Sequence, residues 1–529
     1  MIKMQKNKKN FKHIINNIAP AVLFSIITGL FTALFVILYK FCAKYVVLAS
    51  GESYSFIRNH LYLIPIVLGV FLLASMVLSL IYNKHPNIRG GGIPTSFAIL
   101  RGLITFTWFK NLFGVFIISL FSFFIGLPLC TEGPAVLMGT SIGRGVIKLL
   151  ARKHKEWDRY IMTGGAVAGF SVATGAPVSG VVFVMEEAHQ KISPMIIFIS
   201  FLTVGVACVT GYALAPLVGV SYSLFEIEGL HVLQLSELWI PLALGVIFGF
   251  FAIFFLKLYR CINWFQKRTL QKLPRVFKIF IVLVITFGFG LWSSDFLYSG
   301  HTLLDNLFLG EGLIYMFVIV LLYRTVMTLF SNTSGLTGGL FMPVIAIGGL
   351  ISAIFAKILI NYCGLSPDLY LIIIILGVTA CVASIIKTPI TAVVFAVEVL
   401  ACYQNILPVI LVSGISFAIV QMFRARSITE EVIESRIHDI HAGKKAEIIE
   451  TSIVVQKGAF VIGKQVRDIF FPNGLFIASV KHNTKDVETV DEHGENEIRE
   501  GDVLNIRYST YNEAAVKEEM QYLVGTSDF

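Results

Sequence analysis

Apolar segments follow one another from Ala19 to about Phe423, separated by short polar or glycine-rich stretches. The first runs from about Ala19 to Ser50, which is too long for the apolar core of a signal peptide and fits a retained membrane helix. Others are broken by Gly or Pro, and several are too short to span a membrane alone; examples are Ile93–Leu100 after RGGGIP and Phe341–Ile358 after SGLTGGLFMP. Broken apolar helices line the binding sites of transporters and channels. The pattern therefore predicts an all-α polytopic membrane protein with broken, tilted helices.

The apolar region contains two similar halves, separated by a more polar stretch at residues 220–237. GAPVSGVVFVMEE (175–187) resembles KTPITAVVFAVEV (387–399), and TEGPAVLMG (131–139) pairs with LFMPVIAIG (340–348). The residues in register are Pro177 with Pro389, Phe183 with Phe395, Glu186 with Glu398, and Pro134 with Pro343. A duplicated membrane unit with a broken helix at matching places is typical of a pseudo-twofold transporter fold. The sequence alone leaves open whether the repeat is inverted or parallel.

The character of the chain changes after Arg424. Residues 446–529 are polar, with alternating runs EIIETSIVV, GLFIASVKH and DVLNIRYS that predict strands, and residues 512–524 predict an amphipathic helix. This is a small α+β domain, expected in the cytosol. We divide the chain into a basic N-terminus (1–15), a first membrane repeat (16–220), a second membrane repeat (236–425), a linker helix (426–445) and the terminal domain (446–529).

Composition agrees with a membrane location. The chain is 56% hydrophobic and 14% charged, with a mean hydropathy of +0.78. The formal net charge of +9 fits basic cytoplasmic loops, and no basic stripe carries interleaved aromatic residues, so nucleic acid is not expected as a partner. The N-terminal lysines place that end in the cytoplasm, and we expect a multi-pass protein of the cell membrane with both termini cytoplasmic. The seven cysteines form no CxxC pair, so no metal site or disulfide framework is expected.

Glu132 is the most informative single residue. It lies in TEGP after a long apolar run, where Pro134 fits the first turn of a new helix. A helix start exposes unpaired N–H groups and a positive dipole end, which together bind anions. A carboxylate there can compete with a free anion, although an ordinary N-terminal helix carboxylate is the alternative interpretation. At membrane depth, an ionisable group is costly and by default functional.

Together these motifs resemble the CLC family of chloride channels and proton/chloride antiporters, over about residues 15–430. GGGIP (90–94) corresponds to the family's GSGIP, TEGP to GREGP, and GGLFMP (338–343) to GGxFxP. The GAPVSGVVFVMEE stretch, and KTPITAVVFAVEV with YQNILP (403–408), match further family elements in the same order. The resemblance implies a homodimer of inverted repeats in membrane lipid, with one ion pathway in each subunit.

The resemblance also assigns roles to residues. It implies that Glu132 is the gating, anion-competing carboxylate and Glu187 the inner proton-transfer residue. It implies that chloride binds at the backbone amides of Gly92, Ile93, Leu340 and Phe341. Three positions depart from the family: Gly91 replaces a serine, Thr131 an arginine, and Thr429 the anion-binding tyrosine. Anion selectivity and proton coupling are therefore open. The resemblance implies chloride as transported ligand and no cofactor.

The terminal domain resembles the TrkA-C (RCK C-terminal) module. The matching segments are FVIGKQVRDI (460–469), GLFIASVKH and IREGDVLNIRYS (498–509). Such modules pair with one another and bind small regulators such as nucleotides, so a small cytosolic ligand is expected. A passive dimerisation domain is the alternative.

Three functions of different classes fit to different degrees. We expect proton-coupled chloride antiport gated by Glu132, with a passive chloride channel as the nearest alternative. A cation transporter regulated by the TrkA-C-like domain is disfavoured, because the broken helices offer amide-rich N-termini with one acid rather than rings of carbonyls or carboxylates. A membrane enzyme is not expected, since the spans contain no HExxH, paired aspartates or Ser/Lys dyad.

Overall fold

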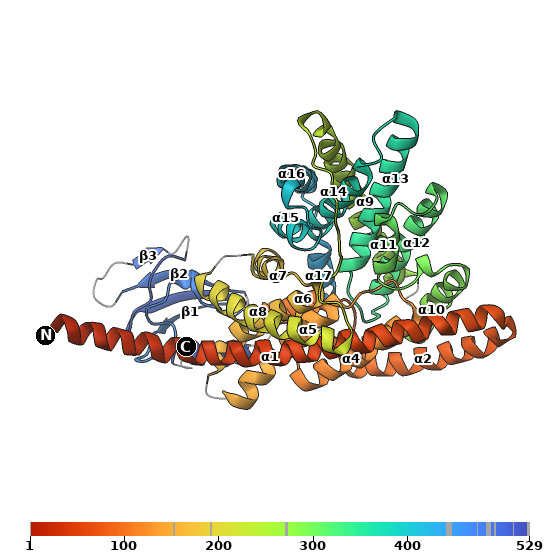
Figure 1. Ribbon diagram of the computed structural model, residues 1–529. Coiled ribbons are helices and arrows are strands. Elements are labelled where there is room, and N and C mark those ends of the chain that lie inside the picture. The colour runs from red at the N-terminus through yellow and green to blue at the C-terminus, as the bar shows by residue number, and fades with distance from the viewer. Residues whose placement is uncertain are drawn as a thin grey trace.

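The computed structural model describes residues 2–151, 154–190, 193–269, 273–440, 447–472, 474–482, 488–490, 494–510 and 513–525. Within them, ten helices are long and apolar enough to cross a membrane. The protein is therefore a multi-pass membrane protein. Figure 1 shows the first half of the chain along the long helix α1, the second half as a separate group of helices beside it, and the small sheet domain near the N-terminal end of α1.

The first half contains broken helices between longer spans, as the glycine and proline pattern predicts. Its helices are α1 (Ile2–Asn59), α2 (Ile64–Lys84), α3 (Ile93–Leu100), α4 (Trp108–Ile125), α5 (Glu132–Leu150), α6 (Asp158–Thr174), α7 (Pro177–Phe183) with the π-helical turn η4 (Val184–His189), and α8 (Pro194–Leu214). The eight-residue α3 is buried along its whole length, so it lies inside the helix bundle rather than against lipid.

The second half repeats this order of elements. Its helices are α9 (Trp239–Arg268), α10 (Arg275–Trp292), α11 (His301–Phe308), α12 (Ile314–Thr333), α13 (Phe341–Cys363), α14 (Leu369–Cys381) with the π-helical turn η8 (Val382–Ile386), α15 (Pro389–Glu398), α16 (Ile406–Met422) and α17 (Ile428–Ile440). Helix α13 begins at the predicted residue but runs to Cys363, so it is long enough to span, contrary to the sequence-based expectation. Its packing on α14 extends the helix beyond the apolar run.

Two carboxylates join the halves through reciprocal helix caps. Glu186 accepts hydrogen bonds from the backbone N–H groups of Ile390 and Thr391 (3.1 and 2.9 Å) and from the Thr391 hydroxyl (2.8 Å) at the start of α15. Glu398 accepts the equivalent bonds from the N–H and hydroxyl of Ser179 (2.7 and 2.6 Å) at the start of α7. Each carboxylate thus satisfies the orphan donors of a helix in the other half. These contacts give Glu186 and Glu398 a structural role between the two halves.

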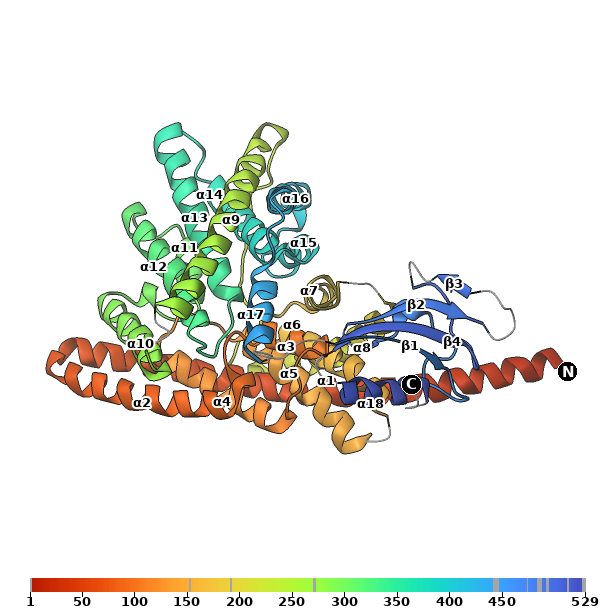
Figure 2. The same ribbon diagram turned by 180° about the vertical axis from the view of Figure 1, so that it is seen from behind.

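Helix α17 differs from the expected solvated linker. Ile428, Thr429, Val432 and Ile433 are buried, and α17 packs against α3 in the membrane core. Figure 2 shows α17 beside α3, on the side of the bundle that faces the terminal domain. The helix is amphipathic enough to present its apolar residues inward although its composition is strongly charged. The remaining residues of the expected linker, 441–445, lie outside the described residues.

The terminal domain is α+β, as predicted. Its sheet has the strand order β1-β4-β2-β3, and all described pairings are antiparallel. The elements are β1 (Glu447–Val454), the one-turn η10 (Val466–Asp468), β2 (Leu475–Lys481), β3 (Glu488–Val490), β4 (Val503–Thr510) and α18 (Glu513–Val524). Met520 and Leu523 of α18 pack with Leu504 and Ile506 of β4 in a core separate from that of the membrane helices.

The reciprocal caps generate a stability prediction. Glu186→Gln removes the charge that three donors face, so we expect a loss of about 1–3 kcal/mol in the free energy of unfolding. Glu398→Gln should cost a similar amount, because its contacts are equivalent. Thermal unfolding of the purified protein in detergent measures the effect, with Glu311→Gln at an exposed position as control. An unchanged midpoint for both cap variants would contradict the structural role.

Candidate functional site

Three glycine-containing turns meet at the centre of the molecule. They lead into the helices α3, α5 and α13. The turn before α3 is tied to the turn before α13 by hydrogen bonds from Gly90 N to Gly335 O (3.1 Å) and from Gly338 N to Gly90 O (3.3 Å). The turn before α5 is tied to the same segment by a two-bond bridge between Cys130 and Gly339 (3.0 and 2.8 Å). The N-terminal ends of α3, α5 and α13 are therefore held together by backbone.

This approach is possible only without side chains. A methyl group at Gly133 would lie 2.1 Å from the Gly91 carbonyl oxygen and 2.7 Å from Gly339 Cα. Gly92 has φ +72°, and a methyl group there would lie 2.2 Å from the Gly133 carbonyl oxygen. Glycine tolerates both the positive φ and the close contact. These glycines allow the three helix starts, with their unpaired N–H groups, to share one small volume.

A cavity of about 30 Å³ lies at the starts of α3 and α13, and the first turn of α17 (Ile428–Ile440) closes it. Five of the six residues expected to bind the anion line it, and Gly92 is adjacent in the chain to two of them. The lining residues are Gly91, Ile93, Pro94, Phe183, Leu340, Phe341, Val344, Ile386, Ile428 and Thr429. The Phe341 ring also contacts the rings of Phe170 and Phe395, at centroid distances of 5.2 and 5.4 Å. An apolar wall excludes water, and this strengthens the field of the helix ends.

Glu132 heads helix α5 and is 2% exposed. The Thr131 hydroxyl donates to Glu132 Oε1 (3.3 Å), and Glu132 Oε2 has no hydrogen-bond partner among the described residues. Glu132 does not line the small cavity, but the next residue, Gly133, touches Gly91 and Gly339 beside it. The carboxylate is therefore one residue away from the convergence of the helix starts. Thr131, which replaces an arginine of the family, contacts it directly.

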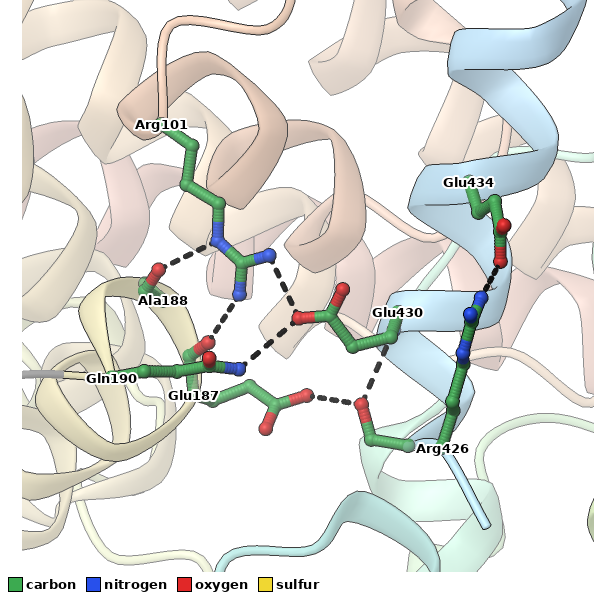
Figure 3. A network of polar contacts seen from close by, with 8 residues as sticks. Arg101, Glu187, Ala188, Gln190, Arg426, Glu430 and Glu434 are labelled. Atoms are coloured by element: carbon green, nitrogen blue, oxygen red, sulfur yellow. Dashed lines mark hydrogen bonds and ion pairs between the residues drawn. The ribbon is translucent and has the colours of Figure 1, made fainter. Parts of the chain in front are cut away.

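Glu187 belongs to a second polar cluster, at the start of α17 (Figure 3). Its side chain is 3% exposed and accepts a hydrogen bond from the Ser427 hydroxyl (2.9 Å). Arg101 donates to the Glu187 backbone oxygen (2.7 Å) and forms an ion pair with Glu430 (2.7 Å). The Ser427 hydroxyl also accepts from the Glu430 N–H (3.2 Å), so it connects the helix start to Glu187. A buried carboxyl with one hydroxyl contact can exchange a proton through that contact.

Thr429 connects the two clusters. It lines the small cavity, and its side chain also lies close to the carboxyl group of Glu187. Thr429 is 4% exposed and lies in the first turn of α17. The structure therefore brings the expected anion-binding hydroxyl and the expected proton-transfer residue into contact.

The terminal domain packs beside Glu187. The centroid of the Phe470 ring lies 4.7 Å from the centroid of the His189 ring and 4.5 Å from that of the Tyr160 ring. Tyr160 donates to Asp468 O (2.6 Å), and Arg159 forms an ion pair with Glu519 (2.6 Å). His189 ends η4, two residues after Glu187, so the domain touches the turn that carries the proton-transfer candidate.

One lysine of this interface has an altered pKa. Lys464 Nζ lies 5.5 Å from the centroid of the Trp157 ring, and burial lowers the pKa of Lys464 to about 7. Below that pH the ammonium group is charged but has lost part of its hydration, a cost that the attraction of the ring faces does not offset. The packed arrangement is therefore favoured as the pH rises above about 7.

Sequence reasoning missed several residues of the site. Ser427 had a signal, since it stands two residues before Thr429 in the same RSITEE motif. Phe183 was noticed only as a repeated residue, although it lines the small cavity. Arg101 and Glu430 gave no signal, because nothing local indicates that α3 and α17 meet.

The comparisons with known proteins agree with this geometry. Residues 70–421 match the family described as "Voltage gated chloride channel". Two H(+)/Cl(-) exchange transporters named ClcA, from Klebsiella pneumoniae strains 342 and ATCC 700721 / MGH 78578, are each 27% identical over 369 residues, which cover 67% of this chain and 76% of theirs. The chain belongs to the voltage-gated chloride channel (CLC) family.

Solved structures share the fold. A slow cyanobacterial Cl⁻/H⁺ antiporter aligns with a TM-score of 0.69 at 23% identity, over 79% of this chain and 98% of that one. A eukaryotic CLC transporter aligns at 0.64 with 17% identity, over 84% and 77%. A CLC-type fluoride/proton antiporter aligns at 0.63 with 18% identity, over 77% and 96%. The membrane helices therefore adopt the CLC fold.

Proposed function

We propose that this protein exchanges chloride for protons across the membrane. The observation that carries the proposal is the small cavity at the starts of α3, α13 and α17, close to the buried Glu132, whose chain neighbour Gly133 lies against Gly91. Helix N-termini supply N–H donors and a positive potential suited to a small anion. The exchange activity named for the ClcA relatives supports the same function.

Glu132 couples the two ions by competition. When ionised, its carboxylate is a tethered anion that can occupy the same amides as chloride. Protonation removes the charge, so the side chain leaves and chloride enters. In each transport cycle the ionised carboxylate occupies the anion site, and the protonated carboxyl group leaves it to chloride. The unpartnered Oε2 fits a side chain that moves between positions.

Glu187 supplies the second proton step. It lies beside Ser427 and Thr429, and Thr429 also lines the anion cavity. A proton taken up at Glu187 must cross the region between Glu187 and Glu132, which includes the anion cavity, to reach Glu132.

A passive chloride channel is the alternative, favoured by Gly91 and Thr429 in place of larger polar side chains at the anion site. Purified protein in liposomes, driven by a chloride gradient, separates the two. A pH electrode and a chloride electrode read together should show protons moving against chloride. Robust chloride flux with no proton movement would favour the channel.

We also propose an orientation in the membrane and an oligomeric state for the protein. We place both termini in the cytoplasm and the protein in the cell membrane, as the basic N-terminus indicates. Two copies form a homodimer in the lipid, and each subunit has its own chloride and proton pathway. The typical organisation of the family supports this arrangement.

The terminal domain is proposed as a regulatory module that binds a small cytosolic ligand such as a nucleotide. Its contacts with Tyr160 and His189 lie next to the turn that holds Glu187. A ligand that binds better when the terminal domain is packed on the membrane helices than when it is released would change how firmly the domain contacts that turn.

Glu132→Gln and Glu132→Ala should uncouple the exchange. Either variant lacks the titrating anion, so chloride flux should persist without pH dependence and proton movement should stop. Paired electrode recordings on liposomes measure both, with Glu226→Gln at an exposed position as control. Proton flux at the wild-type rate in Glu132→Ala would contradict the role.

Glu187→Gln should keep some chloride flux and lose coupled proton movement, because the amide cannot carry the proton. Glu186→Gln, one residue away, is the matched control: it should lower stability and leave coupling intact. The same liposome recordings check both variants. If Glu187→Gln moves protons as well as the wild type does, the proton takes another route.

Phe470→Ala should release the terminal domain, because it deletes the ring that contacts Tyr160 and His189. We expect faster proteolysis between the two domains and a severalfold lower proton flux. Phe476→Ala is the control, since that ring is 60% exposed on β2. Released domains with unchanged proton flux, and no effect of added ATP on wild-type flux, would indicate a passive domain.

A further inference from the structure

Asn332 lies where a side chain at position 91 would begin. It is in the last turn of α12, and its Nδ2 atom would be 3.3 Å from a Cβ atom placed on Gly91. Gly91 itself lines the small anion cavity. The amide of Asn332 therefore lies beside an anion-site position whose residue has no side chain.

The amide nitrogen of Asn332 is buried, and it has no hydrogen-bond partner among the described residues. Its side chain is 6% exposed, and Nδ2 makes no hydrogen bond with any residue that the structure describes. Buried donors are nearly always satisfied, because an unsatisfied donor loses its bonds to water without replacement. This donor points to a ligand.

Asn332 also lines a second, wider cavity of about 720 Å³, between α2, α9, α10, α12 and α17. The two cavities approach each other where Asn332 meets Gly91. Five cationic side chains line the wide cavity, and none of its described lining residues is acidic; the cationic residues are Arg89, Lys267, Arg275, Lys278 and Arg436. A cleft lined by charges of one sign concentrates ions of the opposite sign. An anion in this cavity reaches the helix starts past Asn332.

Arg436 strengthens the positive potential at this point. It comes from α17 and donates to the backbone oxygen of Arg89 and to the hydroxyl of Thr95, beside the start of α3. A cation at a helix N-terminus is unfavourable alone, since the dipole has the same sign. An anion near both relieves that repulsion.

We propose that Asn332 is a ligand of the transported anion, whose amide N–H donates the hydrogen bond that a serine hydroxyl at position 91 would otherwise supply. The inference rests on the proposed chloride transport. It makes Asn332 a specificity-determining residue: an amide donor backed by Arg436 replaces a hydroxyl at the inner side of the anion site. A small halide anion suits the single donor and the narrow space beside Gly91.

Chloride binding to the purified full-length protein, measured by calorimetry, tests the proposal. Asn332→Ala should raise the Kd for chloride about tenfold or more, because one hydrogen bond to a charged ligand is lost. Asn263→Ala, on another wall of the wide cavity, should leave the Kd unchanged. A wild-type Kd in Asn332→Ala would overturn the proposal.

A rescue variant separates a ligand from a structural residue. Gly91→Ser in the Asn332→Ala background should restore much of the lost affinity, since the new hydroxyl takes over the donor role. Gly91→Ser alone should gain less, because Asn332 already supplies that bond. A double variant that binds chloride no better than Asn332→Ala would contradict the substitution of one donor for the other.

If Asn332→Ala does not fold, Asn332→Asp decides, because it keeps the shape and replaces the donor with a negative charge. It should weaken chloride binding further than tenfold, and an unchanged Kd would overturn the proposal. The liposome recordings keep this test distinct from the proposed exchange. A wild type that binds chloride but moves no protons would overturn antiport while leaving the Asn332 result valid.

Discussion

The structure depends on the contact of three glycine-rich turns at the centre of the membrane domain. Gly90, Gly133 and Gly339 bring backbone against backbone, so that the starts of α3, α5 and α13 meet. Unpaired N–H groups in an apolar surrounding need an anion, whether a carboxylate or a free ion. The requirement for glycine, the broken helices and the small cavity all follow from this contact. A side chain at Gly133 would separate the helix starts and remove the site.

The same residue type has two roles within the repeat. Glu186 and Glu398 lie at matching positions and cap each other's repeat, so their environments are equivalent and fully hydrogen-bonded. Glu187 has no such counterpart, because Val399 occupies the matching position. It faces Ser427 at the start of α17 instead. The duplicated framework therefore supplies stability through symmetry, and the proposed proton route uses the residue that departs from it.

Helix α17 connects the anion site with the terminal domain. Its first turn places Thr429 in the anion cavity, and two turns later Arg436 reaches the start of α3. The chain that follows leads into the terminal domain, which also contacts η4 through Phe470. One helix and one aromatic contact thus connect this domain to both the anion site and Glu187. The regulatory ligand proposed above would therefore have two short routes to the transport site.

The sequence alone determined the membrane location, the twofold repeat, the α+β terminal domain and the starts of α3, α5 and α13. These features are local: hydrophobic period, Gly/Pro breaks and a charged residue at a helix start can be read within a short window. Only the tertiary structure decided that α17 belongs to the membrane core, that Ser427 contacts Glu187, and that Asn332 stands beside Gly91. The Ser427–Glu187 contact joins residues 240 positions apart, and Arg436 of α17 lies 341 positions after Thr95 of α3, so no local pattern reports which buried faces meet. The type of a residue predicts whether its own position is buried or polar. Which other residue it contacts depends on the packing of the whole helix bundle.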